Sequence, residues 1–218
     1  TEALTGSDPR RLFTLYAAIK KAKGEITPRE LNALLTSVIA TGRFEEAYLD
    51  WIILLPDSAT SKLAYVYDGD FASLPEFPPF GWNSTSASST YVEAPPGRTD
   101  PALHVVYDGV AERGFPSQLI VLPVGRYALT GEVMSATPSS EGRMQWAIDC
   151  VSAEPEGRLA SLPAPNTSGQ WIRFSTAFTV PAGCPAQRLM LIRTPSDKAA
   201  DIDLWYDKLN VVPAGAAP

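Results

Sequence analysis

Short apolar runs separated by proline and glycine fill the chain from about Leu63 onward, and they restrict its possible folds more than any other feature. Apolar residues in these runs occupy every second position or form brief buried stretches, and turn residues recur roughly every ten positions. The predicted strands are KLAYVYDG (62–69), PALHVVYDG (101–109), SQLIVLPVGRYALTGEVM (117–134), GRMQWAIDCVS (142–152), QWIRFSTAFTV (170–180), AQRLMLIRT (186–194) and IDLWYDKLNVV (202–212). No helical segments alternate with them, which excludes a parallel α/β sheet. About eight such strands predict a mainly β protein, an antiparallel β-sandwich of the jelly-roll type.

The first part of the chain, residues 9–55, follows the helical period instead. Apolar residues within 9–23 recur at the i, i+3, i+4, i+7 spacing of an amphipathic helix. A Thr27 cap with Glu30 three residues later predicts a second helix, and a third is predicted from about 44 to 54. We therefore expect three parts: an α-helical segment of about three helices (1–60), a β-sandwich (63–213) and a short tail (214–218).

The stretch GRFEEAYLDWIILLP (42–56) resembles the second half of a tetratricopeptide repeat. The sequence shows no second copy at the period of about 34 residues that this family has. Two alternatives follow: a tetratricopeptide-like array, or a helical cap packed on the β domain. Either would offer a surface for a protein partner.

Charge and hydropathy narrow the classes of partner. The formal net charge is −6 and the pI is near 4.9, whereas nucleic-acid binders concentrate lysine and arginine. We therefore expect no nucleic-acid partner. The chain has no run of about 18 apolar residues, so no membrane span is predicted. It starts at Thr1 with no leader-like segment, so we expect that a leader or membrane anchor is either absent or removed. If an anchor has been removed, the chain is a soluble fragment of a membrane-anchored protein.

Two cysteines, Cys150 and Cys184, each end a strand-like run. A zinc site needs about four ligands, and the chain adds only one histidine to this pair. A disulfide between neighbouring strands is predicted, with buried free thiols as the alternative. The disulfide would indicate an oxidising location, periplasmic or extracellular.

Several motifs occur in a fixed order: DGDF and FGW (68–71, 80–82), SQLIVLPVGRYALTGEV (117–133), QWIRFSTAFTVP (170–181) and LWYDKLNV (204–211). In this order they resemble the galactose-binding-like jelly-roll carbohydrate-binding modules that are appended to bacterial polysaccharide-acting enzymes. The resemblance covers about residues 63–212. It implies a non-catalytic module that binds a polysaccharide or oligosaccharide, and the pairing with a helical segment favours an exported bacterial protein.

The same resemblance raises the question of a structural calcium site. Such modules often hold calcium with a glutamate of the first motif and an aspartate near the last strand, but Ala72 stands where the glutamate is expected. Asp68, Asp70 and Asp207 remain as candidate oxygen ligands, and turn or capping carboxylates are the alternative. No other cofactor is expected.

Strand alternation separates the expected core from an expected sugar-binding face. Apolar positions of each strand are assigned to the core, which leaves aromatic and planar polar side chains on the other side. Sugar recognition uses aromatic rings to stack on a pyranose and planar polar groups to bind its hydroxyls. The predicted carbohydrate-binding residues are Trp82, Trp171, Trp205, Arg143, Gln145, Arg173 and Glu132. A shifted register, or helices packed over this face, would instead bury the tryptophans.

The sequence offers little for catalysis. The single histidine, His104, occupies a polar position between Leu103 and Val105, and no nucleophile, phosphate-loop or metalloprotease motif occurs. No catalytic residue is predicted. A glycosidase needs two carboxylates about 5–10 Å apart, and sequence spacing does not show whether any two of Glu132, Glu141, Asp149 and Asp203 meet this requirement. Carbohydrate binding is the expected function. The alternative is a protein-interaction or structural scaffold in an envelope or polysaccharide-export assembly.

Overall fold

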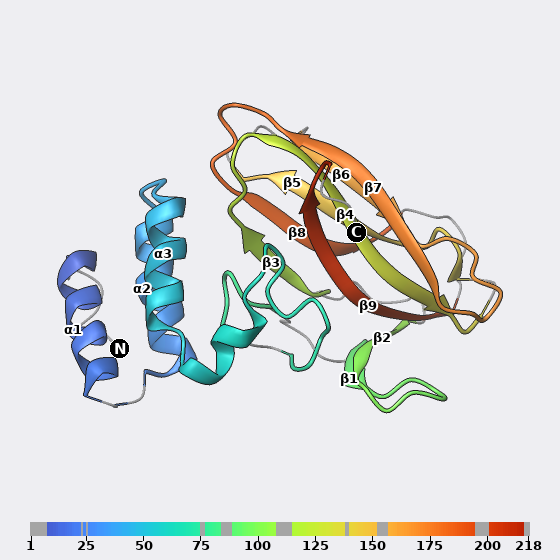
Figure 1. Ribbon diagram of the computed structural model, residues 1–218, viewed down its shortest axis with the longest axis horizontal. Helices are drawn as coiled ribbons and strands as arrows, with labels where there is room; N and C mark the ends of the chain where they lie inside the picture. Colours follow the sequence, from blue (N-terminus) through green and yellow to red (C-terminus); the bar gives the residue numbers. More distant parts are fainter. Residues whose placement is uncertain are drawn as a thin grey trace.

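The computed structural model describes residues 8–22, 24, 26–74, 77–83, 89–107, 115–137, 140–151, 157–194 and 201–215. Three helices lie at one end of the molecule and a two-sheet sandwich lies at the other, with residues 55–74 and 77–82 between them (Figure 1). The fold is mainly β, as predicted. None of the helices in the described ranges is long and apolar enough to span a bilayer.

The helices are α1 (Pro9–Lys21), α2 (Pro28–Ile39) and α3 (Phe44–Leu54). Their starts follow from local chemistry. The Asp8 side chain accepts a hydrogen bond from Arg10 N, and Thr27 with Glu30 forms the predicted capping box. A 3-10 helix (Asp57–Lys62) then leads into the sandwich.

Nine strands in the described part of the chain form two antiparallel sheets. One has five strands in the order β1-β2-β9-β4-β7: β1 (Thr90–Glu93), β2 (Ala102–Tyr107), β9 (Ile202–Pro213), β4 (Gly125–Ser135) and β7 (Ile172–Val180). The other has four in the order β3-β8-β5-β6: β3 (Ser117–Ile120), β8 (Gln187–Arg193), β5 (Met144–Cys150) and β6 (Arg158–Pro163). The sheets face each other across one apolar core, which confirms the antiparallel sandwich.

Alternation within the strands is confirmed where it was predicted. Met144, Trp146 and Ile148 of β5 lie in the core, as do Leu204 and Tyr206 of β9. A bulge in β9, where Lys208 has a positive φ, shifts the pairing with β4 between Thr130 and Glu132. The bulge keeps Leu209 and Val211 in the core beyond it.

The predicted strand 62–69 is wrong, and β1 and β6 were not predicted. Residues 64–70 form turns and bends, because the Tyr67 backbone is bound by a side chain instead of a strand. Gln118 Oε1 accepts from Tyr67 N (2.9 Å), and Gln118 Nε2 donates to Tyr67 O (3.1 Å). This pairing satisfies one residue of backbone without extending it into a sheet.

The helices pack on the β3 edge of the sandwich. Their buried residues form a second apolar cluster that also contains Tyr67, Phe80 and Leu119. Trp51 of α3 lies 5.2 Å from Tyr67, ring centroid to ring centroid, and its Nε1 donates to Phe77 O. The helical segment therefore covers the edge of the four-stranded sheet, as the cap alternative requires. Its tetratricopeptide-like character stays a prediction.

The predicted disulfide is present between Cys150, at the end of β5, and Cys184, in the turn before β8. Replacing both cysteines with serine is expected to lower the free energy of unfolding by about 2–4 kcal/mol, since the unfolded chain gains the freedom that the cross-link removes. Urea unfolding of the double variant Cys150→Ser, Cys184→Ser would measure this loss, with the reduced wild-type protein as the comparison. An unchanged unfolding midpoint would contradict it.

Candidate functional site

The outer face of the five-stranded sheet, the side turned away from the core, gathers four of the predicted residues. Glu132 of β4, Arg173 of β7 and Trp205 of β9 point outward because their strand neighbours point into the core. Trp171 lies immediately before β7. The helices pack instead against Leu119 of β3, at the edge of the other sheet.

Strand register places aromatic and apolar side chains in one row across this face. Tyr91 pairs with His104, His104 with Trp205, and Trp205 with Met134. Trp171 follows at the end of the row, because the next residue, Ile172, pairs with Val133 beside Met134. We call Tyr91, His104, Trp205, Met134 and Trp171 the central row.

His104 lies flat on Trp205 in the middle of the central row. The two ring centroids are 3.8 Å apart and the ring planes differ by 7°. His104 Nδ1 is 2.6 Å from Glu93 Oε1, and Nε2 is 2.9 Å from Asp203 Oδ1. Both contacts are hydrogen bonds only when both ring nitrogens carry a proton. The stack leaves Trp205 only 6% exposed, so Trp205 faces outward as predicted but lies beneath His104.

Arg98, from the loop between β1 and β2, covers Trp171 in a similar way. Its guanidinium carbon is 4.7 Å from the ring centroid, within cation–π range. The same guanidinium donates to the carboxylates of Asp100 and Asp207, and the Asp100 bond is the main reason that the pKa of Arg98 is raised. Trp171 Nε1 is buried without a hydrogen-bond partner among the described residues, a donor that a bound hydroxyl or water would satisfy.

Glu132 lies between two cations on the same side of the central row as Asp207, its register partner in β9. Lys208 Nζ is 3.1 Å from Glu132 Oε2, and Arg173 Nε is 3.7 Å from Glu132 Oε1. The Arg173 side chain is 86% exposed, so its guanidinium remains open to solvent despite this contact. Planar polar groups thus flank the aromatic row, an arrangement suited to binding paired hydroxyls.

Carboxylates outnumber cations on and around this face. The carboxylates are Glu93, Asp100, Glu132, Asp203 and Asp207, and the arginine and lysine side chains are Arg98, Arg173 and Lys208. Burial and the neighbouring Asp207, Asp68 and Asp100 also raise the pKa of Asp70. A polyanion would therefore meet net repulsion here.

Three predicted site residues lie elsewhere: the assignment of Arg143 and Gln145 to this face is wrong, and so is the prediction that Trp82 is an open loop residue. Trp82 is 0% exposed in the core, where it stacks on Phe71 with ring centroids 5.1 Å apart. Arg143 immediately precedes β5, and Gln145 lies within it, so both belong to the four-stranded sheet on the opposite side of the molecule. Alternation along one strand cannot show to which sheet the strand belongs.

The predicted calcium ligands do not fit a calcium site. The Asp68 carboxylate accepts from Ala72 N, Ser73 N and Lys62 Nζ, and Asp207 pairs with Arg98. Across the described ranges, no three His, Cys, Asp or Glu side chains converge as metal ligands. Lys62 and Arg98 thus pair with two of the three candidate ligands, and Asp68 acts as the turn carboxylate that the alternative describes.

Sequence reasoning missed several residues of the face: Tyr91, Glu93, Arg98, His104, Met134, Asp203 and Lys208. The outward position of His104 was predicted, but its role beside Trp205 was not. Tyr91 belongs to the short strand β1, whose four residues give only a weak period-two signal. Arg98 reaches the face from a loop, for which strand alternation makes no prediction.

Comparisons with known proteins return structures only: no family model matches the sequence, and no curated protein matches it. A structure titled "CBM4 structure and function" is 16% identical, with a TM-score of 0.49, covering 68% of this chain and 99% of that chain. A family 61 module in complex with β-1,4-galactotriose is 12% identical, with a TM-score of 0.46, covering 69% and 99%. A family 22 carbohydrate-binding module of Clostridium thermocellum is 12% identical, with a TM-score of 0.48, covering 75% and 100%. At these sequence identities and TM-scores, the similar structures do not assign a ligand to this chain. The evidence for the sandwich fold is the strand order described above.

Proposed function

We propose that the chain is a non-catalytic carbohydrate-binding module whose outer face binds a neutral polysaccharide or oligosaccharide. The central row is the observation that carries this proposal. It places aromatic side chains of β1, β2 and β9 in one line with Met134 and Trp171. Guanidinium and carboxylate groups lie on one side of the row, and the Asp203 carboxylate lies on the other. Sugar rings stack on aromatic faces through their C–H groups, while their hydroxyls bind the flanking polar groups.

The neutral character of the ligand follows from the charges around the row. The excess of carboxylates disfavours a uronic-acid chain, and the exposed Tyr91 and Val106 add apolar area at one end. His104 and Arg98 cover the two tryptophans, so a ligand has to stack beside them or displace them. Tyr91, which is 46% exposed, presents the most open aromatic side chain of the row.

We propose a binding role without catalysis. Asp149 lies in the four-stranded sheet, where it pairs with Arg158, whereas Glu132 and Asp203 lie in the five-stranded sheet. Glu132 is held by Lys208 and Asp203 by His104. The disulfide supports an exported protein in an oxidising compartment, and we extend this to a bacterial periplasmic or extracellular location.

Affinity gels that contain neutral or acidic polysaccharides test the proposal. Tyr91→Ala is expected to weaken binding to the retained neutral polysaccharide by about tenfold, because one stacking surface is lost. Trp171→Ala should weaken it at least as much. Tyr65→Ala, a tyrosine of similar exposure outside this face, is the matched control and should bind like the wild type. Equal retention of all three variants would exclude the outer face as the site.

A scaffold or protein-interaction role is the second candidate. One observation favours it: exposed hydrophobic side chains gather beside α3, away from the outer face. If no polysaccharide retained the intact chain, the scaffold or protein-interaction role would be favoured over carbohydrate binding.

A further inference from the structure

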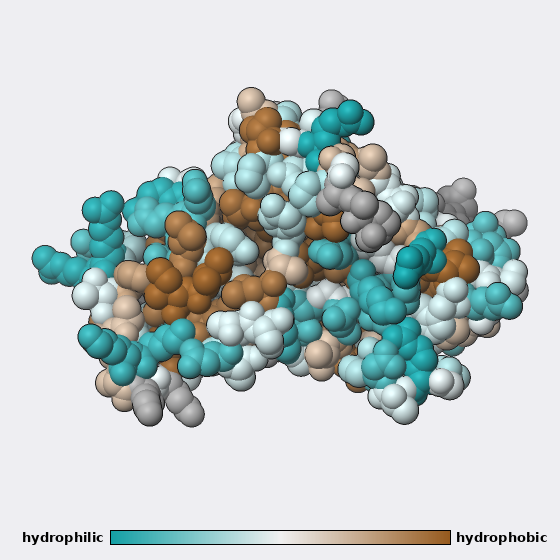
Figure 2. Space-filling view, viewed as in Figure 1, coloured by the Kyte–Doolittle hydropathy of each residue, from teal (hydrophilic) through white to brown (hydrophobic). Residues whose placement is uncertain are grey.

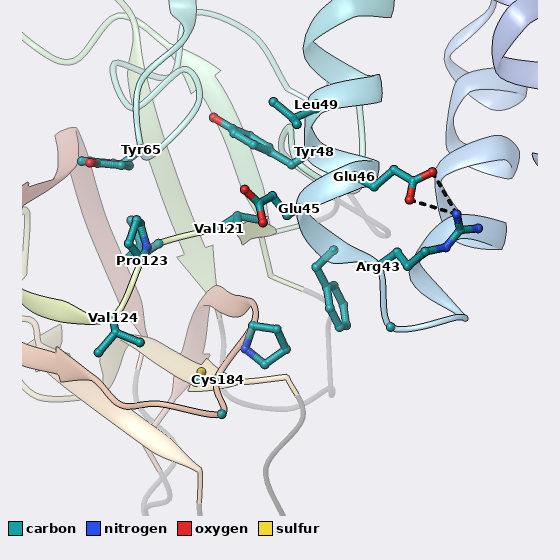
Figure 3. A pocket seen from close by; sticks show the side chains of 15 residues that line it. Arg43, Glu45, Glu46, Tyr48, Leu49, Tyr65, Val121, Pro123, Val124 and Cys184 are labelled. Carbon is teal, nitrogen blue, oxygen red and sulfur yellow. Dashed lines mark hydrogen bonds and ion pairs between the residues drawn. The ribbon is translucent and has the colours of Figure 1, made fainter. Parts of the chain in front are cut away.

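A groove of about 840 Å³ separates α3 from the β-sandwich. One wall is the N-terminal half of α3, the other is the connection 121–124 between β3 and β4 together with Tyr65, and residues 183–185 close one end. Figure 3 shows Tyr48 and Glu45 on the helix side, opposite Tyr65, Pro123 and Val124. A second hollow of about 510 Å³ shares Tyr48 and Tyr65 with it and continues to the end of β9.

Hydrophobic side chains gather around this groove. Seven large hydrophobic side chains are exposed in the described part of the chain, and three of them, Leu49, Tyr65 and Val124, line the groove. Ile53 follows Leu49 one turn later on α3 and is also exposed. Figure 2 shows a hydrophobic region over the helical segment on this side of the molecule. Contiguous exposed apolar surface in a soluble protein marks an interaction site more often than isolated residues do.

The sandwich wall is held rigidly. Tyr127 Oη donates to Pro123 O (2.9 Å), Leu122 N donates to Gln187 Oε1 (3.0 Å), and the Cys150–Cys184 disulfide fixes the end of the groove. Tyr65 also packs edge-on against Tyr127. A wall that is ordered before binding spares the ligand the entropic cost of ordering it.

The charge in the groove is negative. Glu45 points into the groove, and no described cation pairs with it (Figure 3). The one cation in the lining, Arg43, is directed to Glu46, with Nη1 2.9 Å from each carboxylate oxygen. A ligand that fills the apolar walls would therefore gain from a positive charge placed at Glu45.

We propose that this groove binds an extended polypeptide segment that carries apolar anchor residues next to a lysine or arginine. Leu49, Tyr65 and Val124 would contact the anchors, and Glu45 would pair with the cation. The two connected hollows suit an extended chain better than a compact molecule. A glycan is disfavoured, because the groove is mainly apolar and offers few of the planar polar groups that hydroxyls need. This inference does not depend on the proposed carbohydrate function.

A random-peptide phage library selected against the intact chain tests the proposal. We expect enriched peptides with aliphatic or aromatic residues beside Lys or Arg, and a synthetic copy of the strongest one should bind in fluorescence anisotropy. Leu49→Ser should weaken this binding at least tenfold. Leu15→Ser is the matched control, since Leu15 on α1 is 53% exposed and Leu49 is 52% exposed, and it should leave the affinity unchanged.

Charge reversal tests the role of Glu45. Glu45→Lys should also weaken the basic peptide at least tenfold, whereas Glu141→Lys, beyond the far end of β4, should not. Circular dichroism would show that the exposed substitutions leave the fold intact. The proposal is overturned by enrichment of no peptide, by enriched peptides without basic residues, or by peptides that bind all four variants equally. Concentration-dependent dimerisation that Leu49→Ser abolishes would assign the groove to a second copy instead, and glycan retention lost with Tyr65→Ala would assign it to a sugar.

Discussion

Replacing Trp82 with alanine is expected to lower the free energy of unfolding by about 3–5 kcal/mol, the range for removing a buried aromatic side chain. Trp82 is fully buried, and its ring centroid lies 5.1 Å from that of Phe71 and 5.6 Å from that of Trp146. Its Nε1 donates to Asp68 O (3.0 Å), which ties the segment before the sandwich to the core. The substitution therefore leaves a cavity and removes one of the two hydrogen bonds to Asp68 O, which also accepts from Phe71 N (2.9 Å). Urea or thermal unfolding followed by circular dichroism would measure the loss.

Trp171→Ala serves as the comparison for Trp82→Ala. Trp171 is only partly buried on the outer face, so its replacement should cost less stability and more glycan affinity. Trp82→Phe should recover much of the stability lost in Trp82→Ala, because an aromatic ring again fills the stack. If Trp82→Ala kept the wild-type midpoint but lost glycan retention, Trp82 would belong to the binding site and the core assignment would fail.

Gly69→Ala is expected to destabilise the chain by about 3 kcal/mol or more, the upper end of the cost of overpacking. A Cβ at this position would lie 1.9 Å from Leu209 O and 3.0 Å from Leu209 C. Both contacts are with the backbone of β9, and Leu209 N donates to Gly69 O (2.9 Å). Relief of the clash therefore has to move the backbone and break this hydrogen bond. Chemical denaturation gives the change in unfolding free energy.

Gly125→Ala is the control for Gly69→Ala, since the nearest atom to its added Cβ is a Tyr127 side-chain carbon at 3.4 Å. This variant should unfold within about 1 kcal/mol of the wild type. A similar small effect at Gly69 would show that residues 68–71 do not approach β9 as closely as described.

These contacts explain the first of the motifs on which the family resemblance rests, DGDF and FGW (68–71, 80–82). Gly69 lets the chain pass against β9, Phe71 stacks on Trp82, and the Asp68 carboxylate accepts from Ala72 N and Ser73 N. Gln118, before the next apolar run, holds the Tyr67 backbone. The motif residues thus close one end of the sandwich. The outer face takes Glu132, Arg173 and Trp205 from the later motifs of the same order.

Most of the secondary structure was predictable because its causes are local. The Thr27–Glu30 capping box fixes the start of α2, and apolar alternation fixes which side of β5 and β9 enters the core. The two omitted strands carry weak local signals: β1 has four residues, and β6 contains small residues and ends in proline. The segment 62–69 has a strand-like sequence, but the backbone of Tyr67 is hydrogen-bonded by the side chain of Gln118, which is 51 positions away in the sequence.

The candidate site was predictable only in part, for the same reason. Alternation assigned Glu132, Arg173 and Trp205 to outward positions, and each lies there. It also assigned Gln145 to an outward position, yet β5 is in the other sheet and faces the opposite way. Trp82 follows no strand period, so its burial depended on the loop that carries it into the core.

The sequence by itself determined the helical start, the antiparallel β character, the disulfide pair and the inward side of most strands, since each rests on residues near one another or on composition. Tertiary structure decided which strands are neighbours. Strand order brings Tyr91, His104, Trp205 and Met134 into one row although they come from four separate strands. It also sets α3 beside the β3–β4 connection and so forms the groove. Such juxtapositions depend on packing between distant segments, whose free energy no local pattern of residues encodes.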